Sequence, residues 1–256
     1  MHCDIFDLSR YFRRINYTCP AAADSTTLHA IMRHQLFSVP FENLDVQAGK
    51  VVSLVPEEIS DKILHQGRGG YCYEVNGLFA MALEALGIPY RFVAARPMFY
   101  PVRRPKTHMA IIAEVDGRQW LCDLGFGRYG IRAPIALDQL NNDIKQDFDT
   151  FKLTCDAHGE YLLQAKVEGE WCNQYGFDLS PQEWIDFAPA NYLNSTHPDA
   201  IFVQKRLIMQ HCPEGRMILL GDMLKTVTAN GVEKQQLAEE EIDAVLQSRF
   251  GLVSRT

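Results

Sequence analysis

The chain has 256 residues, of which 47% are hydrophobic and 22% charged, a composition typical of soluble proteins with a sizeable core. Its 25 basic and 32 acidic residues give a net charge of −7, and the basic residues are scattered along the sequence. These values exclude disordered and fibrous proteins and argue against a nucleic acid or a membrane surface as partner. The length predicts one globule of two or three closely packed sub-domains.

The most apolar stretch, residues 78–90, is interrupted by Glu84 and Gly87, and it is shorter than the roughly 20 apolar residues that cross a membrane. The first ten residues, MHCDIFDLSR, include acidic side chains and lack the basic flank and apolar stretch of a signal peptide. We therefore expect a cytoplasmic protein. Its seven cysteines form no CxxC pair, so neither a disulfide framework nor a metal site is expected.

The spacing of apolar residues predicts three helices within the first 87 residues. The first runs from Ser25 to Val39, with a serine of the capping type at its start and Pro40 closing it. The second begins at Pro56 and stops at Gly67, residue types that favour these two helix ends. The third helix is the clearest, because its apolar residues follow a spacing of 0, 3, 4, 7, 8 and 11. These residues are Val75, Leu78, Phe79, Ala82, Leu83 and Leu86.

After Gly87 the pattern changes to short apolar segments separated by turn dipeptides, which is typical of β-hairpins. The three hairpins join THMAIIAEV to RQWLCDL through Asp116-Gly117, YLLQAKV to EWCNQYGF through Glu168-Gly169, and MLKTVTA to VEKQQL through Asn230-Gly231. We expect these strands to form a meander or a small barrel. The segment LAEEEIDAVLQSRF then predicts a closing helix, whose acidic first turn suits the helix dipole.

Cys72 is a candidate nucleophile because it stands at the predicted start of the third helix, about one turn before Val75. The unpaired backbone amides of a helix N-terminus favour a thiolate, so we expect this thiol to ionise more easily than an ordinary cysteine of pKa about 8.5. Gly69 and Gly70 precede it and allow a tight turn with space above the sulfur. The alternative is a small hydrophobic core residue.

The hairpin around Asp116-Gly117 supplies a base and an orienting group. A two-residue turn pairs every position i with 233 − i, so Ala110 faces Asp123 and His108 lies diagonally on the same face. One interpretation is a chance polar pair on a solvated face. In the other, the carboxylate orients the imidazole while the imidazole takes the thiol proton, which completes a chain of nucleophile, base and orienting group.

Seven blocks of the sequence resemble the arylamine N-acetyltransferases, a family also described as N-hydroxyarylamine O-acetyltransferases. They cover nearly the whole chain, and the blocks around the cysteine and the aspartate are the most specific. The blocks are YFRRINY (11–17), VPFENLDV (39–46), RGGYCYEVNG (68–77), the TH pair (107–108), DLGFG (123–127), STHPDAIF (195–202) and FGL (250–252).

The resemblance implies an α+β fold built as a papain-like cysteine enzyme. A helical domain (1–87) would carry the nucleophile, a β-barrel-like domain (88–195) the histidine and the aspartate, and a small α/β lid (196–256) would complete the site. The family transfers acetyl groups from acetyl-CoA in a ping-pong cycle and uses no metal or prosthetic group. Carried over by position, Cys72 is the nucleophile, His108 the base and acid, and Asp123 the orienting residue.

The same resemblance implies how substrates bind. The acceptors are arylamines, arylhydrazines and N-hydroxyarylamines, and the enzyme is a monomer or a homodimer. The pocket for acyl group and acceptor takes Phe41, Met98, Phe126 and Phe202, of which Met98 stands where the family commonly has valine. Coenzyme A contacts fall on Thr107, Gly125 and Gly127. Glu42 and Arg68 match a pair that we interpret as a structural ion pair.

Two other functions stay open at this point. A cysteine hydrolase of the papain or transglutaminase type uses the same three side chains, with water instead of an amine resolving the acyl-enzyme. A binding module that has lost its activity is a third interpretation, against which the presence of Cys72, His108 and Asp123 argues.

Overall fold

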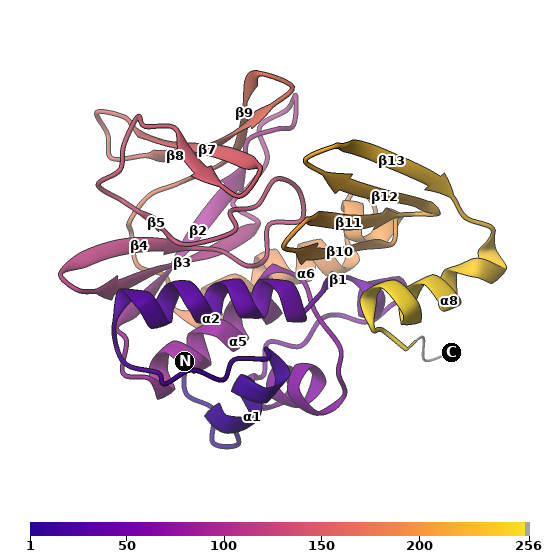
Figure 1. Ribbon diagram of the computed structural model, residues 1–256, viewed down its shortest axis with the longest axis horizontal. Helices are drawn as coiled ribbons and strands as arrows, with labels where there is room; N and C mark the ends of the chain where they lie inside the picture. The colour runs from indigo at the N-terminus through magenta and orange to yellow at the C-terminus, as the bar shows by residue number, and fades with distance from the viewer. Residues whose placement is uncertain (254–256) are drawn as a thin grey trace.

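The structure is a computed structural model that describes residues 1–253 and contains two antiparallel sheets with helices packed against them (Figure 1). The helices are α1 (Leu8–Arg14), α2 (Ser25–Ser38), α3 (Leu44–Gln47), α4 (Pro56–Ser60), α5 (Cys72–Ala85), α6 (Ala188–Thr196), α7 (Ile201–Gln204) and α8 (Glu239–Phe250), with a π-helical turn η1 (Asp61–His65) and a 3-10 turn η2 (Trp184–Phe187). None of the described helices is long and apolar enough to cross a membrane.

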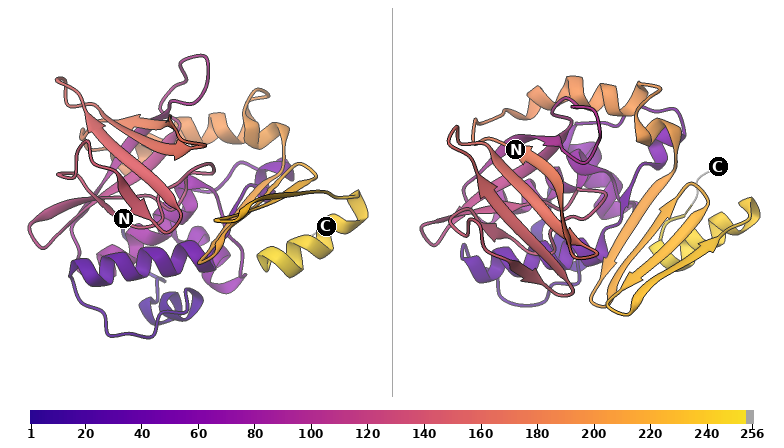
Figure 2. Two further views of the ribbon diagram at one scale, coloured as in Figure 1. Left: turned by 45° about the horizontal axis from the view of Figure 1, so that its top comes forward. Right: turned by 90° about the horizontal axis from the view of Figure 1, so that it is seen from above.

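The larger sheet has the strand order β5-β4-β3-β2-β9-β8-β7-β6 and curls into a half-barrel (Figure 2). The smaller sheet has the order β1-β10-β11-β12-β13. The strands are β1 (Phe41–Glu42), β2 (Tyr90–Pro97), β3 (His108–Val115), β4 (Arg118–Cys122), β5 (Ile135–Ala136), β6 (Ile144–Gln146), β7 (Asp149–Cys155), β8 (Tyr161–Val167), β9 (Glu170–Phe177), β10 (Leu207–Cys212), β11 (Gly215–Leu220), β12 (Met223–Thr228) and β13 (Gly231–Gln236).

The three helices expected near the N-terminus are confirmed as α2, α4 with η1, and α5. One detail differs, because the capping residue of α2 is Asp24 and the serine is the first helical residue. The Asp24 side chain accepts a hydrogen bond of 2.7 Å from the backbone N–H of Thr27, as an N-cap residue usually does. Helix α5 begins at Cys72 itself, which places the cysteine at the helix start as expected.

The hairpin of β3 and β4 has the predicted register, since Val115 pairs with Arg118 and Ile111 with Cys122. Asp116 and Gly117 both have positive φ angles, +53° and +71°, as a type I′ turn requires. The Glu168-Gly169 turn between β8 and β9 is confirmed in the same way. Both of these turns lie in the larger sheet.

The third hairpin differs from the prediction by one residue. Thr228 pairs with Gly231, so the turn consists of Ala229 and Asn230, not of Asn230 and Gly231. Each residue therefore pairs with a partner two positions earlier than predicted, so each side chain stays on its face of the sheet. Asn230 does not adopt the positive φ that a type I′ turn requires, whereas Gly231 has a φ of +134°. The strands after residue 206 pair with β1 and form the separate smaller sheet. The prediction that they continue one meander is therefore wrong.

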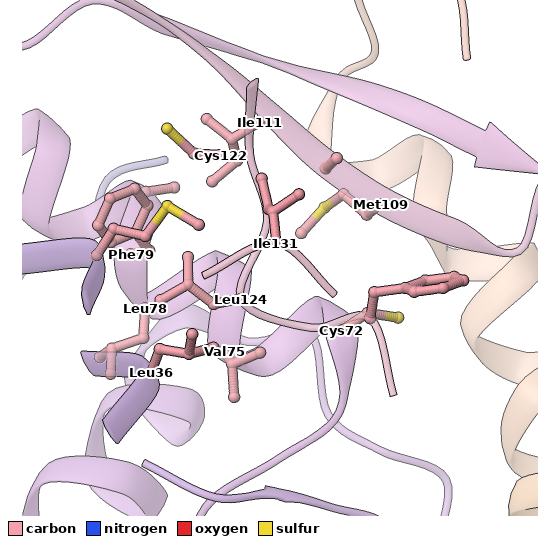
Figure 3. Close-up of a cluster of buried hydrophobic side chains, with 14 of the residues drawn as sticks. Leu36, Cys72, Val75, Leu78, Phe79, Met109, Ile111, Cys122, Leu124 and Ile131 are labelled. Carbon is pink, nitrogen blue, oxygen red and sulfur yellow. The ribbon is translucent and has the colours of Figure 1, made fainter. Parts of the chain in front are cut away.

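Residues 1–253 form two hydrophobic cores. The main core lies between α2, α5 and the larger sheet and includes Leu36, Val75 and Ile111 (Figure 3). A second, smaller core joins Leu219 and Leu224 of the smaller sheet to buried residues of α8, a helix that lies beside this sheet (Figures 1 and 2). The smaller sheet is therefore stabilised by its own helix.

A buried arginine connects the two sheets. Arg132 has no exposed surface, and its guanidinium donates to Asp147 Oδ2 at 2.6 Å and to the carbonyl of Cys212 at 2.6 Å. It also donates to His211 Nδ1 at 3.0 Å. Burial lowers the pKa of His211 well below its ordinary value, and the charge of Arg132 acts in the same direction. His211 is thus a neutral acceptor in this cluster.

Replacing this guanidinium should destabilise the whole protein. We expect Arg132→Met to lower the free energy of unfolding by about 2–4 kcal/mol, because Cys212 O and His211 Nδ1 lose the donor that the buried guanidinium supplies. Urea denaturation measures this loss. The matched control is Arg10→Met on the exposed side of α1, which should stay within about 0.5 kcal/mol of the wild type. Equal stability of the two variants would show that the cluster contributes nothing.

Candidate active site

A cavity of about 300 Å³ opens beside the start of α5. Cys72 and His108 both line it, together with Gly125 and Phe126 from the loop after β4 and Phe202 from α7. In Figure 3, Cys72 lies at the edge of the main core, with its sulfur pointing away from the core side chains. The cavity thus collects side chains from α5, β3, one loop and the start of the C-terminal region.

His108 and Asp123 form the central contact of this site. Nε2–H of His108 donates to Asp123 Oδ2 at 2.7 Å, and both residues are buried. The second oxygen, Oδ1, accepts the backbone N–H of Gly125 at 2.9 Å. Because Nε2 is engaged by the carboxylate, Nδ1 is the ring nitrogen left for proton exchange. The structure therefore brings the predicted base and orienting group together as the hairpin register implied.

Asn76 is a site residue that the sequence reasoning did not single out. Its amide nitrogen donates to Met109 O at 2.8 Å and to Asp123 Oδ1 at 3.2 Å, and its oxygen accepts the Leu124 N–H at 2.9 Å. It thereby joins α5 to β3 and to the loop after β4. Its position four residues after Cys72, on the same helix face, was the available signal.

Tyr175 on β9 was also missed. Its ring centroid lies 5.1 Å from that of His108 and 4.9 Å from that of Phe126. Burial and the nearby charge of Asp123 raise the pKa of Tyr175 well above its ordinary value. Its buried hydroxyl lies near Asp123. No local pattern marks this tyrosine, because only the pairing of β2 with β9 brings it to the histidine.

The thiol of Cys72 is harder to ionise than expected. Burial raises its pKa above the ordinary value, and the charge of Asp123 adds to this effect, whereas the backbone N–H groups of Met109 and Tyr73 lower it. The expectation that the helix start makes this thiol acidic is therefore wrong, since removal from water outweighs the amide groups. A thiolate at this position needs a base, and the imidazole of His108 lines the same cavity.

Two glycines allow the chain to approach the site closely. A Cβ atom on Gly125 would lie 2.4 Å from the Cα of Cys72, and one on Gly127 would lie 3.1 Å from the ring of Phe41. The first distance is shorter than any real contact, so a side chain at position 125 would displace the cysteine. Both glycines and Thr107, the residues expected to contact coenzyme A, line the cavity.

The expected pocket residues divide into three groups. Phe126 and Phe202 line the cavity. Phe41 lies outside the lining, with its ring centroid 6.0 Å from that of Phe202. The prediction that Met98 lines this pocket is wrong, because Met98 borders a separate hollow and is 37% exposed. Its backbone N–H continues the pairing with β9, and side chains alternate along an extended strand, so Phe99 faces the cavity instead.

Charged residues are packed beneath the start of α5. Nε of Arg68 donates to Glu42 Oε1 at 2.9 Å, which confirms the expected ion pair, and Lys62 donates to Glu74 Oε1 at 2.6 Å. The other oxygen of Glu74 accepts the Tyr71 N–H at 3.0 Å and caps the helix. Burial raises the pKa of Glu74 to about 7, and Glu42 adds to the effect against the opposing charge of Lys62. Within residues 1–253, no group of three or more His, Cys, Asp or Glu side chains is arranged to hold a metal ion.

Comparison with known proteins identifies the family. The model of an N-acetyltransferase family matches residues 24–255. The arylamine N-acetyltransferase of Escherichia coli K12 is 32% identical over 96% of this chain and 88% of its own length. The chain belongs to the arylamine N-acetyltransferase family. A relative from Salmonella typhimurium, named arylamine N-acetyltransferase / N-hydroxyarylamine O-acetyltransferase, is 30% identical over 96% of this chain and 88% of its own length.

Solved structures of arylamine N-acetyltransferases share the fold. The Salmonella typhimurium enzyme superposes with a TM-score of 0.91 at 27% identity, over 96% of this chain and 90% of its own. The Mycobacterium marinum enzyme in complex with CoA gives a TM-score of 0.90 at 30% identity, over 96% and 92% of the two chains. The mixed α and β architecture with its curled sheet is therefore the architecture of the family.

The pH dependence of stability tests the environment of Glu74. Its pKa rises from 4.5 in the unfolded chain to about 7, so between these values the folded protein binds the extra proton and loses stability as the pH increases. Glu74→Gln removes this loss. Between pH 4.5 and 8, the free energy of unfolding of the wild type should fall by about 2–3 kcal/mol relative to that of the variant. Urea denaturation at each pH measures this difference.

Glu58→Gln is the control for this experiment, because Glu58 is exposed on the neighbouring helix α4. Its stability should follow the wild type across the same pH range. A constant difference between Glu74→Gln and the wild type would contradict the raised pKa of Glu74.

Proposed function

We propose that the protein is an acetyl-CoA:arylamine N-acetyltransferase that works through an acetyl-cysteine at Cys72. The observation that carries this proposal is the meeting of three groups at one cavity. A thiol at a helix start and an imidazole line the cavity, and a buried carboxylate holds the imidazole at 2.7 Å. This is the arrangement of nucleophile, base and orienting group that acyl transfer requires.

In the first half-reaction, Nδ1 of His108 takes the thiol proton and the Cys72 sulfur attacks the carbonyl carbon of the thioester. The tetrahedral oxyanion needs preorganised donors, for which the backbone N–H groups of Tyr73 and Met109 near the sulfur are candidates. The C–S bond to coenzyme A then breaks, and His108 returns the proton to the departing thiolate. Asp123 keeps the ring in the required tautomer throughout.

In the second half-reaction, the acceptor nitrogen, or the oxygen of an N-hydroxyarylamine, attacks the acetyl group. His108 takes the proton that the acceptor loses, and the tetrahedral intermediate collapses with release of the Cys72 thiolate. The imidazolium then gives its proton to the Cys72 thiolate, which returns the enzyme to its starting state. The same imidazole thus serves both steps.

The lining of the cavity favours aromatic acceptors. Phe99, Phe126 and Phe202 supply ring surfaces on which an arylamine can stack. An arylamine is neutral at pH 7 and enters such a lining without the desolvation cost of an alkylammonium ion. Arylhydrazines share this property. We therefore propose small aromatic acceptors as the partners of this enzyme.

Two arginines suit the phosphate groups of the donor. Arg104 and Arg128 are exposed and line the cavity, which places them at its opening. Each guanidinium is held over an aromatic ring, Arg104 at 4.9 Å from Tyr100 and Arg128 at 4.4 Å from Phe99. Thr107, Gly125 and Gly127 would then contact the arm of coenzyme A inside. We propose acetyl-CoA as the donor, with its phosphates near the two arginines.

The finer organisation follows the same proposal. We propose a papain-like core in which α5 supplies the nucleophile and the larger sheet supplies the imidazole and carboxylate. Its domains would be 1–87, 88–195 and 196–256, the last three residues lying outside the described part. The enzyme would act in the cytoplasm as a monomer or a homodimer.

Mass spectrometry of the intact protein tests the proposed cycle. Brief exposure to acetyl-CoA without an acceptor should add one acetyl group to Cys72, and an arylamine such as an anisidine should then remove it. Cys72→Ala should gain no acetyl group, whereas the exposed Cys19→Ser should behave like the wild type. Retained acetylation of Cys72→Ala would refute Cys72 as the nucleophile. Loss of the acetyl group to water as fast without the arylamine as with it would favour a hydrolase.

Donor kinetics test the two arginines. Arg104→Gln and Arg128→Gln should each raise the KM for acetyl-CoA about three- to tenfold, since each removes a charge-assisted contact. The rate with p-nitrophenyl acetate, a donor without phosphates, should stay the same. Arg103→Gln is the control, because Arg103 borders the other hollow. An unchanged KM in both variants would remove the phosphates from this opening.

A further inference from the structure

Helix α6 buries polar side chains and exposes apolar ones. Asn191, Asn194 and Ser195 are only 4–6% exposed, whereas Tyr192 is 62% and Leu193 37% exposed. This is the reverse of the usual surface helix, whose apolar face turns inward. Buried polar groups require hydrogen-bond partners, so the contacts of these three side chains show what the helix holds in place.

Asn191 and Ser195 hold Tyr71, the residue before Cys72. The hydroxyl of Tyr71 donates to the side-chain oxygen of Asn191, and it lies 3.1 Å from Ser195 Oγ. Asn191 also donates to the backbone carbonyl of Val52 at 2.8 Å. Tyr71 directly precedes Cys72, so α6 is fastened to the chain at the start of α5.

Asn194 holds Thr107, the residue before His108. Nδ2 of Asn194 donates to the backbone carbonyl of Thr107 at 3.0 Å, and the hydroxyl of Tyr73 donates to the same oxygen at 2.9 Å. Thr107 directly precedes His108, and Tyr73 directly follows Cys72. One carbonyl oxygen therefore accepts a donor from α5 and a donor from α6, which uses both of its lone pairs.

This carbonyl lies where the sheet stops supporting the chain. His108 is the first residue of β3, and its pairing with Ala95 ends the ladder with β2. Chain beyond the end of a ladder loses the backbone bonds that fix its position. The two side-chain donors at Thr107 take over that support immediately before the catalytic imidazole.

We infer that Tyr73 and Asn194 are positioning residues, which set the distance between the sulfur of Cys72 and the imidazole of His108 by jointly holding the Thr107 carbonyl. This inference rests on the proposed function, because it assigns the two residues to proton transfer between that thiol and that ring. Neither residue exchanges a proton itself. A buried thiol gives up its proton only to a base within hydrogen-bond reach, so a loosened His108 leaves the thiol protonated.

The test is a double-mutant cycle of Tyr73→Phe and Asn194→Leu with two measurements. The first is the pH dependence of Cys72 alkylation by iodoacetamide, which needs no acetyl-CoA. The second is the single-turnover rate of acetylation by acetyl-CoA. Each single variant should shift the alkylation midpoint to higher pH and slow acetylation about three- to tenfold. The double variant should slow it by more than the product of the two effects, because the carbonyl then has no donor.

Controls separate positioning from folding. Tyr192→Phe removes an exposed hydroxyl from α6, and Asn142→Leu changes an exposed asparagine; both should leave the midpoint and the rate unchanged. Tyr73→Phe removes a single oxygen atom, so it preserves the fold even where Asn194→Leu does not. A lower melting temperature with an unchanged alkylation midpoint would assign the two residues to stability and overturn the inference. Rate effects that simply multiply would also overturn it.

The two proposals fail in different ways. Absence of acetylation of wild-type Cys72, together with shifted alkylation midpoints in the variants, would remove acetyl-CoA as donor and keep the positioning role. Normal acetylation of the wild type, together with unshifted midpoints in Tyr73→Phe and Asn194→Leu, would keep the enzyme and remove the positioning role.

Discussion

A buried carboxylate has to be compensated, and the Asp123 side chain imposes this requirement on the centre of the protein. Taking a carboxylate out of water costs several kcal/mol unless donors replace the lost hydration. Three donors do so here: the imidazole of His108, the side-chain amide of Asn76 and the backbone N–H of Gly125. They come from β3, α5 and the loop after β4. The carboxylate is therefore satisfied only where these three elements meet in one arrangement, and the same arrangement brings the imidazole to the cavity.

Much of this arrangement follows from local sequence. An Asp-Gly dipeptide between two apolar segments predicts a type I′ turn, and the turn fixes the register that places His108 beside Asp123. The helix that begins at Cys72 follows from apolar spacing alone. Both signals act over fewer than 20 residues, where backbone conformation and side-chain periodicity decide the structure. The family resemblance adds the chemistry of the site but not these contacts.

Longer-range effects escape such reasoning. Tyr175 reaches His108 only through the pairing of β9 with β2, which no local pattern encodes. Phe99 lines the cavity in place of Met98 because the pairing with β9 extends one residue past β2. The pKa of Cys72 depends on how much water the folded chain excludes. Each of these outcomes is decided by tertiary packing, which overrides the local preference.

The backbone of Gly125 lies against the Cα of Cys72, and this contact determines how molecules reach the sulfur. Main chain covers that flank of the cysteine, so a group attached to the sulfur is approached from the cavity. In the proposed cycle, donor and acceptor then share one entrance. The spent donor has to leave before the next nucleophile can reach the acyl carbon, which separates the two half-reactions in time. In a steady state, free coenzyme A and the amine therefore compete for the same space.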